Sequence, residues 1–353
     1  MKKIMHILLA LLMVVILDAC NFRPLTDYNN THYVRVYIDE EIDNTTKGFY
    51  RDDIIKPQYK RPEVMKVVLA EEASGRVVAE KYLRNQGDDE KGHYYDGYII
   101  CSPGEWNLMA YNFDTQSTQI SDPSNIRQAK AFTNNIASHL YSSLFSRLNV
   151  KGDDDKFKDE RIVYEPDHLF VVESESVKVG YSGQIDTLRT QNGQYFTAGT
   201  IVEAWYIQVN IKGLNNLSSA VSLLNGLSGS KQLINSQIDK NDPITLYFEM
   251  APGLKTKNDP NEGILYSTFY TFGNIPDKGN DLNITFDLMT NYGKPMSAML
   301  DITEEFSKPL AVDHHWIILD KTLVIPDKPK GSEGGGFAPG VDDWGDVNTD
   351  LII

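Results

Sequence analysis

Short runs of apolar and polar residues alternate along most of the chain, and this period of two predicts β-strands rather than helices. The clearest run in the first half is 106–111, in which Trp106, Leu108 and Ala110 fall on one face. Five such strands before residue 112, with no helix between them, favour an antiparallel β-sandwich. The short loop at 73–75 predicts a hairpin between the second and third strands. The five predicted strands are 33–38, 64–69, 76–83, 94–101 and 106–111.

A second series of strand patterns begins near residue 177 and predicts a second sandwich. Its longest run is 200–211, and turn-forming segments at 261–263 and 277–280 separate later runs. Residues 214–233 are rich in Ser, Asn and Gly, and we interpret them as a loop that packs on the sheet with one or two helical turns. The later predicted strands are 244–250, 264–272, 282–288, 298–302 and 316–325.

One helix is predicted in the first half of the chain. Ile136, Leu140 and Leu144 recur there at helical spacing. The fold class predicted from these patterns is therefore all-β, with two tandem sandwich domains and one short helix in the first.

The start of the chain is typical of a signal peptide. Lys2 and Lys3 precede an uninterrupted apolar run, Ile7–Leu17, and a small residue then precedes Cys20. The run is too short to cross a bilayer core of about 30 Å as a stable helix. Residues 17–20 resemble a bacterial lipobox, in which Cys20 is acylated and becomes the mature N-terminus. The alternative is an ordinary secretory signal peptide that is followed by a cysteine by chance.

The net charge and the cysteine content limit the kinds of partner that the protein is expected to bind. Removing residues 1–19 leaves 334 residues, about two domains by size, and changes the formal charge from −15 to −16. Such a surface repels nucleic acid and anionic lipid headgroups, so membrane contact is expected through the lipid on Cys20. With Cys20 acylated, Cys101 has no disulfide partner. Cys101 lies at the end of a strand pattern, which predicts a buried, inert thiol.

The end of the chain predicts a short strand on a flexible linker. Prolines and glycines dominate residues 326–336. A period of two then sets alternate residues on one face, and such a segment can complete an exposed sheet edge on a neighbouring chain or on the same chain. Self-pairing and disorder are equally compatible with the pattern. The candidate strand-donor residues are Val347, Thr349, Leu351 and Ile353.

These patterns divide the chain into five segments. The predicted segments are a signal peptide at 1–19, a tether at 20–32, an N-terminal β-sandwich at 33–174, a C-terminal β-sandwich at 175–326, and a Gly-rich linker with a candidate strand at 327–353.

No group of residues predicts catalysis, a cofactor or a metal site. His314 and His315 are adjacent, and neighbouring strand residues point to opposite faces, so the two imidazoles cannot easily bind one ion. The acidic segment 153–155, with Asp159 and Glu160, lacks the glycine and the final glutamate of an EF-hand loop. There is no nucleophile elbow and no phosphate-binding glycine loop before a helix. We therefore expect a protein that is not an enzyme.

Several segments together resemble one family. Taken in order, they resemble the fimbrillin superfamily of Bacteroides-type lipoproteins. The similarity is greatest to its Mfa/FimB-like minor subunits, a group in which some members are known only as domains of unknown function. The segments that carry the resemblance are the lipobox, 64–69, 102–115, 165–169, 207–217 and 336–345.

The resemblance implies two transthyretin-like β-sandwich domains and a non-enzymatic role as an anchoring or accessory subunit in fimbria assembly and adhesion. It also implies attachment to the outer membrane through Cys20, a cell-surface location, and other fimbrillin-like subunits as partners. Polymerising members of the family lose an N-terminal strand to an arginine-specific protease, whereas anchor-type members keep their lipid. Arg35, Arg51 and Arg61 are possible cleavage sites in this sequence, but an arginine in or beside a strand has no special claim to cleavage, so we expect an anchor or accessory subunit that is not cleaved.

The alternative function is glycan binding by an outer-membrane lipoprotein of a polysaccharide-uptake system. Such a protein is also built from β-sandwiches on a lipid tether. It would use exposed aromatic side chains, with Tyr94, Tyr95 and Trp344 as candidates.

Overall fold

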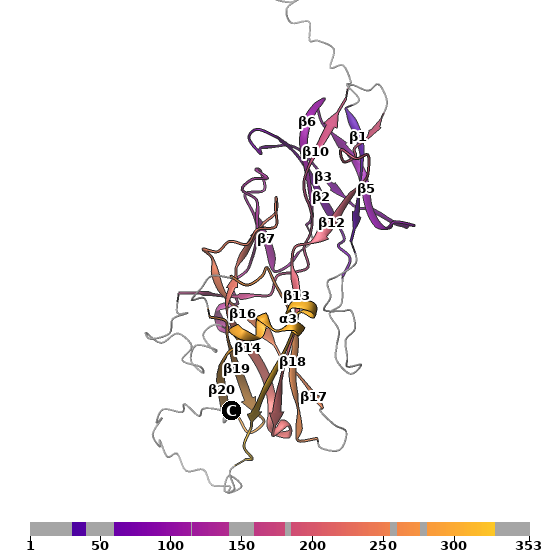
Figure 1. Cartoon of the computed structure of the whole chain (residues 1–353). Coiled ribbons are helices and arrows are strands. Elements are labelled where there is room, and N and C mark those ends of the chain that lie inside the picture. The colour runs from indigo at the N-terminus through magenta and orange to yellow at the C-terminus, as the bar shows by residue number, and fades with distance from the viewer. Residues whose placement is uncertain are drawn as a thin grey trace, which may run out of the picture.

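The computed structural model describes residues 30–39, 60–113, 115–140, 159–180, 185–254, 260–275 and 281–328. Strands dominate this part of the chain, and they form two units stacked end to end (Figure 1). The predicted all-β class is therefore confirmed. Helical structure within the described residues is limited to short segments: residues 138–140, η1 (Leu214–Asn216), η2 (Thr303–Ser307) and α3 (Pro309–His314).

The N-terminal unit is a nine-stranded sheet that folds over one apolar core. Its order is β3-β2-β6-β10-β12-β1-β5-β4, with β11 paired to β1. Val34 and Val36 of β1, Leu69 of β2 and Leu108 of β6 meet in this core. The strands are β1 (Thr31–Ile38), β2 (Met65–Glu71), β3 (Val77–Leu83), β4 (Asn85–Asp89), β5 (Gly92–Ile100), β6 (Gly104–Asn112), β10 (Phe170–Val179), β11 (Asp186–Thr187) and β12 (Phe196–Thr200).

The C-terminal unit has two sheets that share one core. Their orders are β17-β18-β13-β21 and β20-β19-β14-β16-β9. Phe248 of β16 stacks on Phe269 of β18 with ring centroids 4.6 Å apart, which joins the two sheets. The strands are β9 (Arg161–Tyr164), β13 (Glu203–Lys212), β14 (Leu217–Ser228), β16 (Pro243–Glu249), β17 (Ala251–Leu254), β18 (Glu262–Thr271), β19 (Asn283–Thr290), β20 (Pro295–Asp301) and β21 (Trp316–Val324).

A third apolar cluster joins the two units. Met109 and Tyr111 of β6 and Val68 of β2 extend from the N-terminal unit and meet Ile201 and Phe272 in one cluster. The cluster also takes residues from a small sheet of β7 (Thr118–Ser121), β8 (Lys130–Thr133) and β15 (Ser230–Gln232).

The sheets are mixed, whereas the sequence predicted antiparallel sandwiches. β1 runs parallel to β12, with Val36 opposite Phe196, and β13 runs parallel to β21. β16 also pairs in parallel with β9. Parallel partners must be joined by long connections, and these partners lie far apart in sequence, so local patterns carried no sign of their direction.

The segment 214–233 is the clearest error in the predicted elements. It holds the 12-residue strand β14 at the centre of its sheet, where a loop was predicted. The register of β14 shifts between Leu217 and Ser219 and again between Leu224 and Leu227. Each irregularity breaks the alternation of apolar residues, which is why the period of two was not visible.

The predicted domain boundary and the predicted helix lie at positions that the structure describes at least in part. The expected boundary between residues 174 and 175 falls inside β10, which pairs with β6 on both sides of that point. β9 precedes the boundary but pairs with β16 of the C-terminal unit. Residues 138–140 are helical, in agreement with the predicted helix around Ile136–Leu144, and residues 141–144 lie outside the described residues.

Gly213 ends β13 at a turn that tolerates no side chain. Its φ is +83°, and a Cβ there would overlap the carbonyl oxygen of Ile325, just after β21. Ile325 donates its N–H to the Lys212 carbonyl at 2.8 Å, which holds the two backbones together. Gly293 has the same φ, but a Cβ added there would have no heavy atom within 4 Å beyond its chain neighbours.

These two glycines allow a matched test. Gly293→Ala should cost about 1 kcal/mol of unfolding free energy, because alanine disfavours the left-handed region. Gly213→Ala carries the same conformational cost plus the clash, and should cost at least about 2 kcal/mol more. Urea unfolding of both variants measures the difference. Equal losses would show that the contact with Ile325 is unimportant.

Candidate functional site

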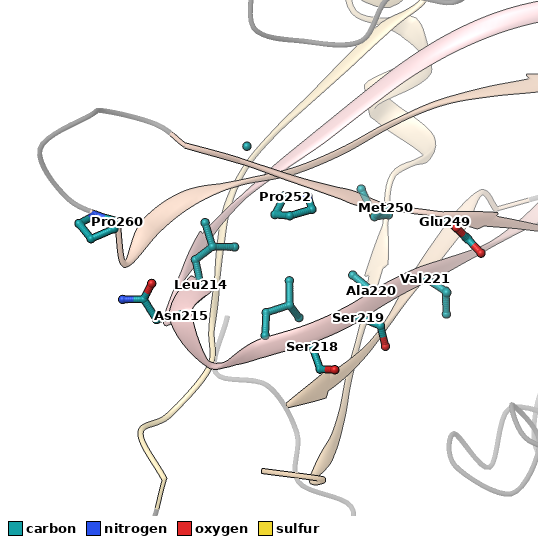
Figure 2. A pocket seen from close by; sticks show the side chains of 12 residues that line it. Leu214, Asn215, Ser218, Ser219, Ala220, Val221, Glu249, Met250, Pro252 and Pro260 are labelled. Atoms are coloured by element: carbon teal, nitrogen blue, oxygen red, sulfur yellow. The ribbon is translucent and has the colours of Figure 1, made fainter. Parts of the chain in front are cut away.

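A groove of about 570 Å³ opens at the end of the C-terminal unit that lies away from the N-terminal unit. Figure 2 shows it between the start of β14 and the edge strand β17. We call it the edge groove. It is lined by Leu214, Asn215, Leu217, Ser218, Ser219, Ala220, Val221, Glu249, Met250, Pro252, Gly253 and Pro260.

The edge groove exists because the chain leaves the sheet of β14 at the end of β16, before it reaches the start of β14. β14 pairs with β19 from Leu217 onward, but with β16 only from Val221. The Met250 N–H still reaches the Ala220 carbonyl at 3.0 Å. Beyond Met250 the chain becomes β17 and pairs with β18 in the other sheet. Among the residues that the structure describes, 217–219 therefore have a strand partner on one side only.

An open strand edge beside apolar side chains suits an extended peptide. The peptide can add to the sheet through main-chain hydrogen bonds, while its alternate side chains enter the groove. β17 forms the opposite lip, but Pro252 has no N–H to donate. β14 is therefore the better template, and the edge groove is a candidate docking site for an extended polypeptide.

The described chain ends close to the edge groove. Asn216, next to the groove residue Leu217, donates from Nδ2 to the Pro326 carbonyl and to Asp327 Oδ1, both at 3.2 Å. The Tyr292 hydroxyl also donates to the Pro326 carbonyl, at 3.1 Å. The segment that follows residue 328 therefore starts within reach of the groove.

The segment 165–169 carries the chain from the C-terminal unit back to the N-terminal unit. Asp167 accepts backbone N–H bonds from Gln116 and Thr118 at 2.7 and 2.8 Å, and another from Ser117. His168 stacks on Phe170 with ring centroids 4.9 Å apart. This segment, one of those that carry the family resemblance, is thus a structural tie between the units.

The side chain of Glu165 lies in the same junction and accepts the Tyr270 N–H at 2.9 Å. Burial raises the pKa of this carboxyl to about 7, and the negative charge of Glu249 acts in the same direction. The hydrogen bond from Tyr270 opposes the shift because it stabilises the charged form.

A tyrosine and arginine cluster covers the outer face of β1. The Arg35 guanidinium lies 3.7 Å from the Tyr94 ring centroid and forms ion pairs with Asp89 and Asp96 at 3.1 and 3.3 Å. The Tyr37 hydroxyl donates to Asp89 at 2.8 Å. Because these groups satisfy one another, we interpret the cluster as a structural feature of the sheet face.

Comparison with known proteins places the chain in a family. A family model described as a domain of unknown function, DUF5119, matches residues 57–249. The chain belongs to the DUF5119 family. A protein of Bacteroides ovatus named "Putative fimbrium anchoring subunit Fim4B" is 24% identical over 320 residues, which cover 83% of this chain and 85% of that protein.

A solved structure shares the fold of this DUF5119 protein. The crystal structure described as "a putative adhesin" from Bacteroides ovatus ATCC 8483 superposes with a TM-score of 0.50 at 18% identity. The match covers 88% of this chain and 98% of the other. Together with the family match and the similarity to Fim4B, it confirms the resemblance to the fimbrillin superfamily.

Most sequence-predicted site residues of this DUF5119 protein lie outside the described residues. These are the lipidation site Cys20, the strand-donor residues Val347, Thr349, Leu351 and Ile353, the candidate cleavage site Arg51, and Trp344.

The remaining predicted residues can be placed. Cys101 is buried, as predicted, and burial raises the pKa of its thiol to about 11. Arg35 lies inside β1, whose neighbours on both sides are strands, and Arg61 pairs with Asp88 at 3.3 Å. The glycan-binding candidate Tyr95 is fully buried and cannot stack on a sugar.

Three of the residues weighed for metal binding have other contacts, and the acidic segment 153–155 lies outside the described residues. His315 stacks on Trp205 and His314 on Trp316, with centroids 4.4 and 4.6 Å apart. Glu160 accepts the Thr245 hydroxyl at 3.0 Å. In the described ranges, no three His, Cys, Asp or Glu side chains gather as metal ligands would. Among those same residues, no helix has the length and apolar content needed to cross a bilayer.

Sequence reasoning missed the edge groove because its main strand was taken for a loop. The signal that could have found it is the abrupt change after Glu249, where an apolar strand is followed by Ala251, Pro252 and Gly253. A proline and a glycine directly after a strand often mark a bend or an edge.

The raised pKa of Glu165 predicts a pH dependence of stability. The folded carboxyl has a pKa of about 7 against an ordinary value of 4.5, so the folded state holds the proton over that interval and the unfolded state does not. The free energy of unfolding should therefore fall as pH rises from about 4.5 to about 7 and level off above it. Glu165→Gln should weaken this dependence.

Urea midpoints measured at pH 5, 6, 7 and 8 test this expectation. Glu72→Gln, at an exposed position, is the control and should follow the parent protein. Parallel pH profiles for Glu165→Gln and the parent would contradict the assignment.

Proposed function

We infer that this protein is a non-enzymatic cell-surface lipoprotein that anchors or supports a fimbria. The observation that carries the inference is the similarity to the Bacteroides ovatus protein named as a fimbrium anchoring subunit, which extends over most of both chains. A match of this extent includes both units and the segments between them, so it supports a role for the whole molecule.

The lipid on Cys20 supplies the anchor. A charged start, an apolar run and a lipobox-like ending on Cys20 support acylation at that thiol. Each buried CH₂ of an acyl chain contributes about 0.8 kcal/mol, so several chains hold a protein firmly in a bilayer. The protein is then attached to the outer membrane and exposed at the cell surface.

The two units correspond to two transthyretin-like domains of the family. The chain passes for the last time from the N-terminal unit to the C-terminal unit after β12, because β10 and β12 pair within the N-terminal unit and β13 belongs to the C-terminal unit, which β9 enters earlier in the sequence. Each unit has a core of its own, which supports two domains that pack through the third cluster.

The tail and the edge groove provide the contact with a neighbouring fimbrial subunit. The alternation of Val347, Thr349, Leu351 and Ile353 suits a strand donated to an exposed edge. The edge groove offers an open strand edge at the same end of the molecule at which the described chain finishes. Subunits therefore join at this end, through extended segments.

Acylation can be tested in the full chain. In a Bacteroides-type host, the parent protein should fractionate with the outer membrane and carry acyl groups on residue 20 by mass spectrometry. Cys20→Ser should lose both properties, because no thiol remains to be modified. Cys101→Ser is the matched control and should keep them. An unmodified Cys20 in the membrane fraction would overturn the lipid anchor.

The contact with the stalk can be tested by removing the tail. Deletion of residues 340–353 should abolish co-purification with the fimbrial stalk, because the donated strand is lost. Membrane fractionation should be unchanged in this variant, since Cys20 is intact. Normal co-purification of the truncated protein would show that the tail is not the contact.

Two lysines in the edge groove give a second arm of the same test. Ser219→Lys with Pro252→Lys places charge on both lips, which should block strand addition and reduce co-purification. Met299→Lys, at an exposed position on the edge strand β20, is the control and should have no effect. If co-purification is lost when the tail is deleted but not when the two lysines are introduced, the strand edge that receives the tail lies on the neighbouring subunit.

A further inference from the structure

Three exposed apolar side chains gather where the described chain begins. Ile100 is 71% exposed, Ile185 is 56% exposed and Tyr98 is 50% exposed. The sheet register sets Ile100 opposite Thr31, and the pairing of His32 with Asp186 brings Ile185 beside the same residue. We call Tyr98, Ile100 and Ile185 the apolar tip.

Side chains on this sheet face change in character with distance from the tip. Behind the two isoleucines, Tyr98 packs against Tyr33 with ring centroids 5.6 Å apart. The Tyr33 hydroxyl donates to Asp96 at 2.5 Å, and the Arg35–Asp96 ion pair follows. With increasing distance from the tip, the side chains are first aliphatic, then tyrosines, then charged groups. Proteins that enter a membrane surface show this order, because tyrosine places its ring among acyl chains and its hydroxyl among headgroups.

The number of residues between Cys20 and β1 limits the distance between the tip and a lipid on Cys20. Thr31 lies 11 positions after Cys20. A fully extended segment of that length reaches about 38 Å, and a flexible one has an average end-to-end distance of about 18 Å. Acyl chains on Cys20 would therefore hold the tip within a short distance of the bilayer, where even a weak apolar contact is favoured by its high effective concentration.

We propose that the apolar tip rests in the headgroup region of the bilayer that holds the acylated Cys20. This proposal depends on the lipid anchor inferred above. The contact is apolar rather than electrostatic, because the mature chain is strongly acidic and Asp186 lies beside the tip. β1 and β5 lie at the opposite end of the molecule from β17 (Figure 1), so the tip orients the edge groove away from the membrane.

Fluorescence quenching in vesicles tests the contact. The full-length precursor with Ile100→Cys is acylated in the host, labelled with NBD maleimide at pH 7, and reconstituted in vesicles of phosphatidylcholine and phosphatidylethanolamine with a spin-labelled headgroup. Cys20 is blocked by acylation, and Cys101 is buried with a raised pKa, so the label goes to residue 100. The same label at Met299→Cys, 55% exposed in the C-terminal unit, is the control.

Quenching at residue 100 should be several-fold greater than at residue 299, with a blue shift of the emission. Adding Ile185→Glu to the Ile100→Cys protein should reduce that quenching, because a charge must then enter the interface. Ile185 is exposed, so the melting temperature should hardly change. Met299→Glu in the same background should leave quenching at residue 100 unaltered.

The possible outcomes distinguish a failure of the membrane contact at the apolar tip from a failure of the lipid anchor. Failure of the labelled protein to float with the vesicles would overturn the lipid anchor and, with it, the tip. Flotation with equal quenching at residues 100 and 299 would overturn the tip alone. Protection of residue 100 only after purified fimbrial subunits are added would show that the tip is a protein-docking surface, which also overturns the proposal.

Discussion

The junction between the two units determines what the rest of the structure can do. Its apolar cluster draws residues from β2, β6, the small sheet and the start of the C-terminal unit, so neither unit can turn without exposing them to water. Asp167 adds a polar tie, because its carboxylate accepts three consecutive N–H groups, two from the loop before β7 and one from the first residue of β7. The apolar tip and the edge groove consequently stay at opposite ends of one body.

Open strand edges arise wherever a strand leaves its sheet before its neighbour ends. The chain crosses from one sheet of the C-terminal unit to the other at Met250, and the start of β14, which has no described strand partner on that side, follows from this crossing. Edges of this kind normally invite unwanted pairing, and Pro252 on β17 limits it by removing an N–H. The start of β14 has no such protection, which fits an edge that is kept for a partner.

The sequence predicted elements better than it predicted their partners. Regular strands such as β6 and β13 were found because each alternates or runs apolar over most of its length. β14 was missed because two register shifts disturb its alternation, and the parallel partner of β1 was missed because β12 lies about 160 positions later. The edge groove depends on β14 and on the crossing of the chain to the other sheet after Met250, so no local pattern could have revealed it. The junction role of Glu165 likewise depends on Tyr270, which is distant in sequence.

An anchor must withstand tension, and the position of β1 determines how a pulling force would be transmitted to the sheet. Cys20 precedes β1, and β1 pairs with β5 on one side and with β11 and β12 on the other. A pull on the tether acts along β1, so the hydrogen bonds on both sides are loaded together in shear. A pull across an edge strand would instead break its bonds one after another. The load then passes from β12 through the junction to β13, and reaches the edge groove without crossing a free linker. In the anchoring role proposed above, the first strand is thus the element least suited to proteolytic removal, because it joins the lipid to the sheet.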